Sequence, residues 1–532
     1  MQRIKLTLIP ILTGISLVFY AWCVSYPVSI DSPYDFVYNH ISYLYWLSLP
    51  ILFASFFIVA IETKSNTLQW VMAVSTVLLM YSLAYFYYMI PGSDAHQFRS
   101  LTEYFISTGD LSSKPYHDYY QWPLFFILNN IAVSIMGLDL RYFEFILFGT
   151  IGIVTTSSLY LYASKARANG YLAVIAFSII MRYFFNYQWA PFSLSLSLLL
   201  LIFNLDSHMH EKLEGVIAML IIFTSITLTH AFIPVFFLIY CFLMYIMEKN
   251  AKYLKLFLST SIIYLLWQIF SPASPFPDLV KQFTNIFTLE YGSHIEATLA
   301  SLAAPQPYID VIAQIFSRTV VVATTIITGV GFICLLIAKQ LRNVDYAILL
   351  TGVLYSAIGL LLPVLGTRAI TFVAIPASLG ALYLTESKFK KYFKSVFLIV
   401  IIFSTFITIH KTFYDTQIFH QTRKEYKCSN FVIHNYNWQN SSLLLSHFRV
   451  MHYVQKRSLS EDVVFKNDIY DKNFSQDIKD YDCVVYTVGL GKNFLRLNYS
   501  IQKSLSEFEI NHFNLIYNSG NFSYVFLTSS KK

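Results

Sequence analysis

The stretch YYMIPGSDAHQFRSLTEYF, residues 87–105, marks the place where an apolar part of the chain ends abruptly. Residues 68–90 are nearly uncharged, and Pro91 and Gly92 are then followed by an acid, Asp94, and an imidazole, His96. About 20 apolar residues in a helix are enough to cross a hydrocarbon core. The preceding run is therefore long enough to span a membrane, and we expect Asp94 and His96 to stand at a membrane edge.

The composition of the whole chain agrees with that expectation. Of 532 residues, 56% are hydrophobic and only 13% are charged, and the mean hydropathy is +0.53. Soluble globular domains carry about 25% charged residues. These values exclude a water-soluble protein and indicate a multi-spanning membrane protein.

Polar residues, Pro and Gly divide the apolar sequence into segments. We predict about thirteen transmembrane helices, at 5–28, 41–61, 68–90, 142–163, 171–185, 191–205, 214–230, 231–247, 253–270, 318–338, 345–364, 369–385 and 395–411. Several are shorter than a full crossing, so the pairs that meet near 185–191 and 230–231 share ends or re-enter the membrane.

Basic residues set the expected orientation of these helices. The connections that alternate from the N-terminus are short and basic, for example at Lys165 and Arg167 and at 388–394, whereas the longer opposite loops hold few cations. Because basic loops stay in the cytoplasm, we expect a cytoplasmic N-terminus and an extracytoplasmic tail in the cell membrane. The working surface then faces outward, with two long loops at 91–141 and 271–317.

The remaining regions complete a predicted domain order. Residues 119–138 are interpreted as a helix in the outer membrane interface, with Tyr120 and Trp122 as anchors. Residues 1–67 hold two helices, 68–411 form the membrane core, and 412–532 change to a polar composition. The tail contains short β-like runs, SSLLLSHF, DCVVYTVG, FNLIYNSG and FSYVFLTSS, and ends in a hairpin that turns at 518–521. The fold class expected is a polytopic all-α membrane protein with a small extracytoplasmic α/β domain.

The outward loops hold the candidate functional residues. Asp94 reads most simply as part of a helix N-terminus, where a carboxylate is favourable. His117, Asp118 and Trp122 follow in the same loop, and aromatic rings with carboxylates suit a carbohydrate or phosphate site. Four more polar side chains lie at predicted outer edges, and a fifth lies in the second long loop: Arg182, Gln188, His230, Arg368 and Glu290. Capping or snorkelling accounts for each one alone, but together they suit an anionic lipid headgroup.

At these residues the chain resembles glycosyltransferases of the GT-C fold, a class that includes protein O-mannosyltransferases, lipid A aminoarabinose transferases and oligosaccharyltransferase catalytic subunits. The resemblance is carried by GSDAHQFRSLTEYFISTGDL after an apolar span, by YHDYYQWPLFFIL and by the soluble tail. It implies transfer of a sugar from a polyprenyl-phosphate or polyprenyl-diphosphate donor to an acceptor at the outer face. The class's first-loop acid corresponds to Asp94, which would be the general base on the acceptor hydroxyl.

The resemblance also implies roles for the other polar residues. Arg368 and Arg182 would hold the charge of the leaving phosphate, and His96, His117 and Asp118 would orient substrate or bind a divalent cation, Mg²⁺ or Mn²⁺. The sequence differs from two of these families in their signature motifs. The WWDYG signature of oligosaccharyltransferases is absent, and the acidic dipeptide of O-mannosyltransferases is replaced by Asp94 and Ala95.

Rival functions remain open at the level of sequence. A transporter or flippase binds its substrate near the midplane between broken helices with buried ionisable groups, and here only Glu144 approaches such a position. A glycan polymerase or ligase of the outer face would keep the lipid-linked substrate on a different fold. Cys428 and Cys483 in the tail fit either a disulfide or two free thiols.

Overall fold

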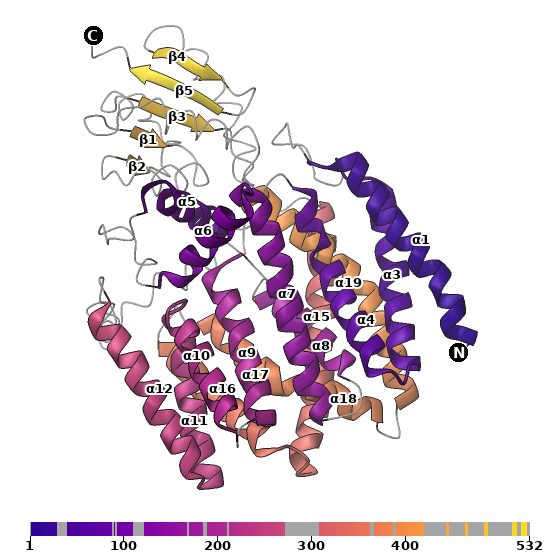
Figure 1. The fold of residues 1–532 in the computed structure, drawn as a ribbon. Coiled ribbons are helices and arrows are strands. Elements are labelled where there is room, and N and C mark those ends of the chain that lie inside the picture. Colours follow the sequence, from indigo (N-terminus) through magenta and orange to yellow (C-terminus); the bar gives the residue numbers. More distant parts are fainter. Residues whose placement is uncertain are drawn as a thin grey trace.

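The computed structural model describes residues 2–28, 40–87, 90, 93–109, 122–166, 170–184, 189–209, 212–271, 308–361, 366–386 and 390–419, together with five strands between 443 and 528. At some positions inside these ranges, among them Asp94, His96, Arg182 and Arg368, only the backbone is described. The described helices form one bundle, and a sheet lies beyond the end of the bundle where helices α5 and α6 lie (Figure 1).

Helices occupy all thirteen predicted segments. In chain order they are α1 (Gln2–Ser25), α3 (Tyr43–Glu62), α4 (Asn66–Tyr81) with the 3-10 turn η1 (Ser82–Phe86), α7 (Leu140–Ala166), α8 (Tyr171–Phe184), α9 (Pro191–Met209), α10 (Leu213–Thr227), α11 (Ile233–Glu248), α12 (Ala251–Phe270), α15 (Tyr308–Ile337), α16 (Asn343–Leu361), α17 (Gly366–Ala377), α18 (Leu379–Glu386) and α19 (Lys390–Phe419). Within the described residues, six helices are long and apolar enough to cross a membrane, and shorter apolar helices accompany them. The chain is a polytopic membrane protein.

The three largest differences from the predicted boundaries involve α15, α19 and the pair α17 and α18. The single segment expected at 369–385 is two helices, because Pro376 has no backbone donor and Ser378 interrupts the helix by bonding to the carbonyl of Ile375. Helix α15 begins at Tyr308, inside the expected loop 271–317, and α19 continues to Phe419, beyond the expected boundary at 411. Hydropathy missed both extensions because these helical turns contain polar residues.

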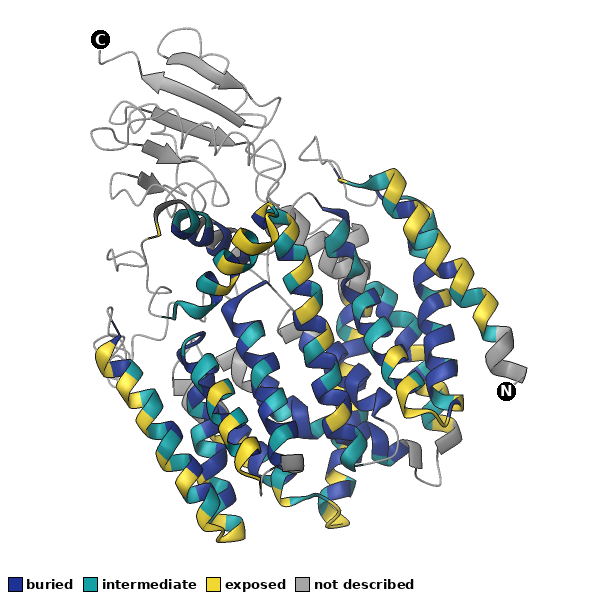
Figure 2. Ribbon diagram, viewed as in Figure 1, coloured by how far each residue is buried: buried dark blue, intermediate teal, exposed yellow. Residues whose placement is uncertain are grey.

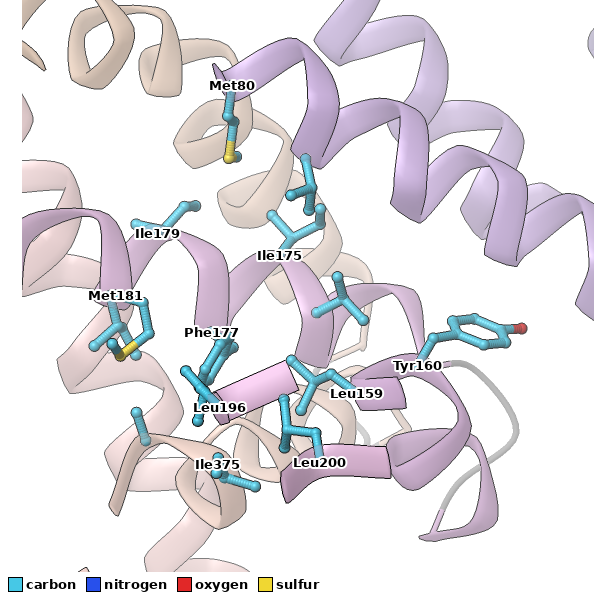
Figure 3. Close-up of a cluster of buried hydrophobic side chains, with 14 of the residues drawn as sticks. Met80, Leu159, Tyr160, Ile175, Phe177, Ile179, Met181, Leu196, Leu200 and Ile375 are labelled. Atoms are coloured by element: carbon cyan, nitrogen blue, oxygen red, sulfur yellow. The ribbon is translucent and has the colours of Figure 1, made fainter. Parts of the chain in front are cut away.

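Helix α8 is the centre of the bundle. Each of its residues from Tyr171 to Met181 is buried, while α1 and α12 show exposed stripes along their length (Figure 2). Figure 3 shows the apolar packing around α8, with Met80 from α4, Leu159 from α7, Leu196 and Leu200 from α9, and Ile375 from α17. The exposed apolar stripes on the peripheral helices are the surfaces expected to contact lipid.

Helices α15 and α18 cross at a pair of glycines. A methyl group added at Gly331 would collide with the backbone of Gly380, and one added at Gly380 would collide with the carbonyl of Thr328. Small residues at a crossing let two backbones approach closely in a membrane. The crossing therefore requires glycine at both positions.

Two further helices lie at one end of the bundle. Helix α5 (Ser93–Thr108) follows the end of η1, and α6 (Leu124–Met136) starts after Pro123 and ends at Gly137, which has a φ of +62°. At 1.5 Å per residue the 13 residues of α6 are about 20 Å long, too short for a crossing. A short apolar helix within the predicted range 119–138 is confirmed, and its depth in the membrane remains a prediction.

The tail contains a five-stranded sheet with the order β2-β1-β3-β5-β4. The strands are β1 (Leu443–Leu445), β2 (Val463–Phe465), β3 (Cys483–Thr487), β4 (Phe513–Asn518) and β5 (Ser523–Thr528). Strand β1 pairs in parallel with β2 and β3, whereas β5 is antiparallel to both β3 and β4. The four predicted strands and the closing hairpin are confirmed, and β2 was not predicted. The pairing of Cys483 with Cys428 involves a residue outside the described part.

Candidate functional site at the α5 end of the bundle

Helix α5 carries Asp94 as its second residue. The first turn of a helix exposes unpaired N–H groups and a partial positive charge, so an acid is stabilised there. Farther along the helix, Phe98, Arg99, Leu101 and Thr102 are buried. Helical periodicity places position 94 on the same stripe of α5 as Phe98 and Leu101, which face the rest of the protein.

Aromatic side chains connect α5 to the membrane helices. The ring of Phe98 lies 6.0 Å from that of Phe125 in α6, and Phe125 lies 5.1 Å from Trp189, just before α9. In the first turn of α9, Phe192 meets the imidazole of His230 edge-on at 5.4 Å. We call these five residues the aromatic bridge. It brings the helix that carries Asp94 close to the start of α9 and to the turn that carries His230.

His230 lies in the turn between α10 and α11 and is buried. Its Nδ1 accepts a hydrogen bond from the backbone N–H of Phe232 at 3.2 Å. Because an accepting nitrogen carries no proton, this geometry assigns the proton of the neutral ring to Nε2. In the neutral ring the N–H donor is therefore Nε2.

Three other elements hold the His230 turn in place. Three backbone carbonyls of the turn accept hydrogen bonds. Leu228 O accepts from Leu124 N at 3.0 Å, Ala231 O accepts from Tyr264 Oη at 3.2 Å, and Phe232 O accepts from Tyr355 Oη at 3.1 Å. These donors come from α6, α12 and α16. The turn is thus fixed from three directions, which is how a binding group keeps its orientation.

The two candidate arginines lie on helices whose ends reach the same end of the bundle. Arg368 is in the first turn of α17, and one turn later Phe372 stacks on Phe236 of α11 at 3.8 Å and lies 5.3 Å from Tyr355. Arg182 is in the last turn of α8, which packs against α17. The structure describes only the backbone at these two positions, so the orientation of the arginine side chains stays a prediction.

The other candidates are divided between described and undescribed residues. Trp122 is half-buried, and its Nε1 has no hydrogen-bond partner within the described part of the chain. His117, Asp118, Gln188 and Glu290 lie outside the described ranges, as do the side chains of Asp94 and His96. The described residues contain no group of three or more metal-ligating side chains. The divalent cation expected near His96, His117 and Asp118 stays a prediction.

Sequence analysis assigned no partner to Glu144, and the structure supplies one. The carboxylate of Glu144 in α7 pairs with the guanidinium of Arg99 in α5, with Arg99 Nε donating to Oε1 at 2.6 Å and Nη2 donating to Oε2. The signal available in the sequence was the acid itself, because an acid within an apolar span requires a cation. It did not indicate which cation, since 45 residues separate the two.

No protein-family model matches the chain. No curated protein matches it in sequence either. Solved structures nevertheless share its fold. The apo oligosaccharyltransferase of Archaeoglobus fulgidus gives a TM-score of 0.50 at 11% identity, over 87% of this chain and 74% of that chain. AglB from the same organism, in complex with an inhibitory peptide and a dolichol-phosphate, gives 0.50 at 10% identity, over 86% and 74%.

A third structure, ArnT from Cupriavidus metallidurans in the apo state, gives a TM-score of 0.48 at 9% identity, over 87% of this chain and 98% of that chain. At such low identities the two archaeal structures establish the fold alone. The chain has the fold of GT-C glycosyltransferases, as the resemblance in its sequence predicted.

Proposed function

We propose that this protein is an integral membrane glycosyltransferase that moves a sugar from a polyprenyl-phosphate-linked donor to an acceptor at the outer face of the membrane. The acceptor would be a cell-surface glycan, a glycolipid or a glycoprotein, and the transferred group a hexose-type sugar. The observation that carries the proposal is the position of Asp94. In a chain with the GT-C fold, the first turn of a helix at the end of the bundle holds a carboxylate.

The proposed chemistry divides the work between two sets of residues. Asp94 accepts the proton of the acceptor hydroxyl while that oxygen attacks the sugar, and the bond from the sugar to the phosphate breaks. Arg368 and Arg182 stabilise the phosphate as it takes up negative charge. The Nε2–H of His230 is a further donor to the lipid phosphate or to the sugar. The dolichol-phosphate bound to AglB fits the same class of donor.

Orientation forms part of the proposal. The turns that carry Lys165, Lys249 and Arg342 lie at the end of the bundle opposite to α5. The positive-inside rule assigns that end to the cytoplasm. The N-terminus of α1 and the sheet of the tail also lie at opposite ends (Figure 1). The α5 end, with the tail domain 412–532, would therefore be extracytoplasmic.

The test is turnover by the purified protein in lipid nanodiscs with radiolabelled polyprenyl-phosphate and polyprenyl-diphosphate sugars. Loss of label from the donor, to an acceptor or to water, reports cleavage of the bond between sugar and phosphate. We expect cleavage by the wild type and a loss of about 10²- to 10⁴-fold in Asp94→Asn, because a general base contributes that much. Asp110→Asn, the same change in the same loop, is the matched control and keeps its activity.

The rival function gives a different result in the same preparation. A flippase or transporter moves the intact donor between the leaflets of a proteoliposome and leaves the bond between sugar and phosphate unbroken. Translocation of donor without cleavage would overturn the proposal. Equal turnover of Asp94→Asn and wild type would remove Asp94 from the chemistry.

A further inference from the structure

The ion pair between Arg99 and Glu144 has features that a simple structural contact does not need. Both side chains are buried, at 1% and 0% exposure, and the guanidinium meets the carboxylate with two nitrogens. Removing two charges from water is costly, and apolar residues of similar size hold helices together at least as well. A bidentate pair additionally fixes the relative orientation of the two side chains, because the planar guanidinium bonds a carboxylate in few orientations.

The two helices joined by the pair differ in how firmly they are held. Helix α7 packs against α4, α8 and α9 within the bundle, so Glu144 is a fixed point. Helix α5 packs mainly on α6, through contacts such as those of Phe98 with Phe125 and Phe126. Ring contacts of this kind define the rotation of a helix less sharply than a bidentate ion pair does, because the pair bonds in few orientations.

Arg99 lies close to Asp94 on the same helix. The two positions are five residues apart, which corresponds to about 7.5 Å along the axis of α5. A rotation of α5 about its axis would move position 94 together with Arg99, and the bidentate pair resists that rotation. The pair therefore acts on the part of α5 that carries the proposed base.

We propose that Arg99 and Glu144 are positioning residues that set the rotation and height of α5, and thereby the place of Asp94 at the site; this inference rests on the proposed function. The reacting geometry depends on them because a catalytic carboxylate must be held within a fraction of an ångström of its productive position.

The experiment combines a distance measurement with kinetics. In a protein without its native cysteines, spin labels are placed at Ser93→Cys in α5 and at Ile146→Cys on the exposed side of α7. The double variant Arg99→Met with Glu144→Leu keeps apolar packing and removes the fork. We expect a narrow distance distribution with the pair intact and a broader or shifted one in the double variant. The matched control, Arg342→Met with Asp345→Leu at the opposite end, keeps the narrow distribution.

Kinetics in the cysteine-containing protein distinguish positioning from folding. We expect the double variant to lose at least tenfold in kcat, with the KM for the lipid-linked donor changed less than threefold and the unfolding midpoint not lowered. Arg99→Lys, which keeps the charge without the fork, is expected to lose kcat to an intermediate extent. If the double variant keeps both the narrow distribution and the wild-type kcat, the inference is overturned. If the wild type cleaves no donor but its narrow distance distribution broadens in the double variant, the result supports the positioning role. It then contradicts only the proposed function.

Discussion

The two ends of the bundle bury carboxylates in different ways. At the α5 end, Glu144 has Arg99 as a partner from a helix that lies across the end of the bundle. At the opposite end, Asp206 near the end of α9 accepts hydrogen bonds from the hydroxyls of Tyr240 in α11, at 2.6 Å, and Tyr253 in α12, at 3.1 Å. The first arrangement joins the bundle to a helix outside it, and the second joins membrane helices to one another.

A second carboxylate at that end also joins two membrane helices, although an arginine holds it through two nitrogens as well. Asp345, in the first turn of α16, accepts from the hydroxyl of Tyr162 in α7 at 2.6 Å and from Arg342 Nη2 at 2.7 Å. Positions 144 and 162 of α7 are about 27 Å apart at 1.5 Å per residue, so one helix carries a polar contact near each end. We refer to the residues around Asp206 and Asp345 as the basic-end network. The comparison suggests that this network stabilises the bundle, while the Arg99–Glu144 pair orients α5.

The largest expected effect comes from comparing Asp206→Leu with Glu144→Leu. Asp206→Leu leaves two phenolic hydroxyls without an acceptor, at about 1 to 3 kcal/mol each, so the free energy of unfolding falls by about 2 to 6 kcal/mol. Glu144→Leu leaves the unfolding midpoint of the bundle nearly unchanged, because α5 opens locally instead. Denaturation in mixed micelles, with hydrogen exchange of the α5 amides, checks both. Equal losses of bundle stability in the two variants would erase the distinction.

A smaller effect is expected for Tyr240→Phe. The substitution keeps the ring, which packs against Phe203 at 4.9 Å, and removes the hydrogen bond to Asp206. A hydrogen bond to a charged acceptor contributes about 1.5 to 3 kcal/mol, and we expect the lower figure because Tyr253 still donates. Sugar cleavage should not change. Tyr20→Phe on the exposed face of α1 is the control and should leave stability unaltered.

The smallest effect is expected for Lys252→Met. The Nζ of Lys252 is 4.0 Å from Asp206 Oδ1, and the lysine side chain is 20% exposed. An ion pair at that distance and exposure contributes about 0 to 1 kcal/mol. A loss as large as that of Tyr240→Phe would show that the cation, rather than the phenols, holds Asp206.

The sequence predicted most of the helices and strands, but not the contacts between them. Apolar runs predicted where helices occur, since burial in a membrane demands continuous apolar segments. The β-like runs predicted four strands, but β2 is three residues long and left no clear pattern. The break between α17 and α18 depends on Pro376 and Ser378, residues that helices in membranes often tolerate.

The partners of buried polar groups were the part that sequence did not reveal. Asp94 stood out because a carboxylate follows an apolar run directly. Arg99 did not stand out, because in the sequence it is one more cation in an external loop. Its pairing with Glu144, like that of Tyr240 with Asp206, joins positions 34 to 45 residues apart through the packing of whole helices. No local pattern encodes such distances.

Photocrosslinking decides most directly which end of the bundle binds a lipid-linked donor. A polyprenyl phosphate with a diazirine next to the phosphate would be irradiated with the protein in nanodiscs, and the modified peptides mapped by mass spectrometry, with unlabelled polyprenyl phosphate as competitor. We predict competed crosslinks in α5, in the turn at His230 and in the first turn of α17. Competed crosslinks that fall on the basic-end network instead would contradict a donor site at the α5 end.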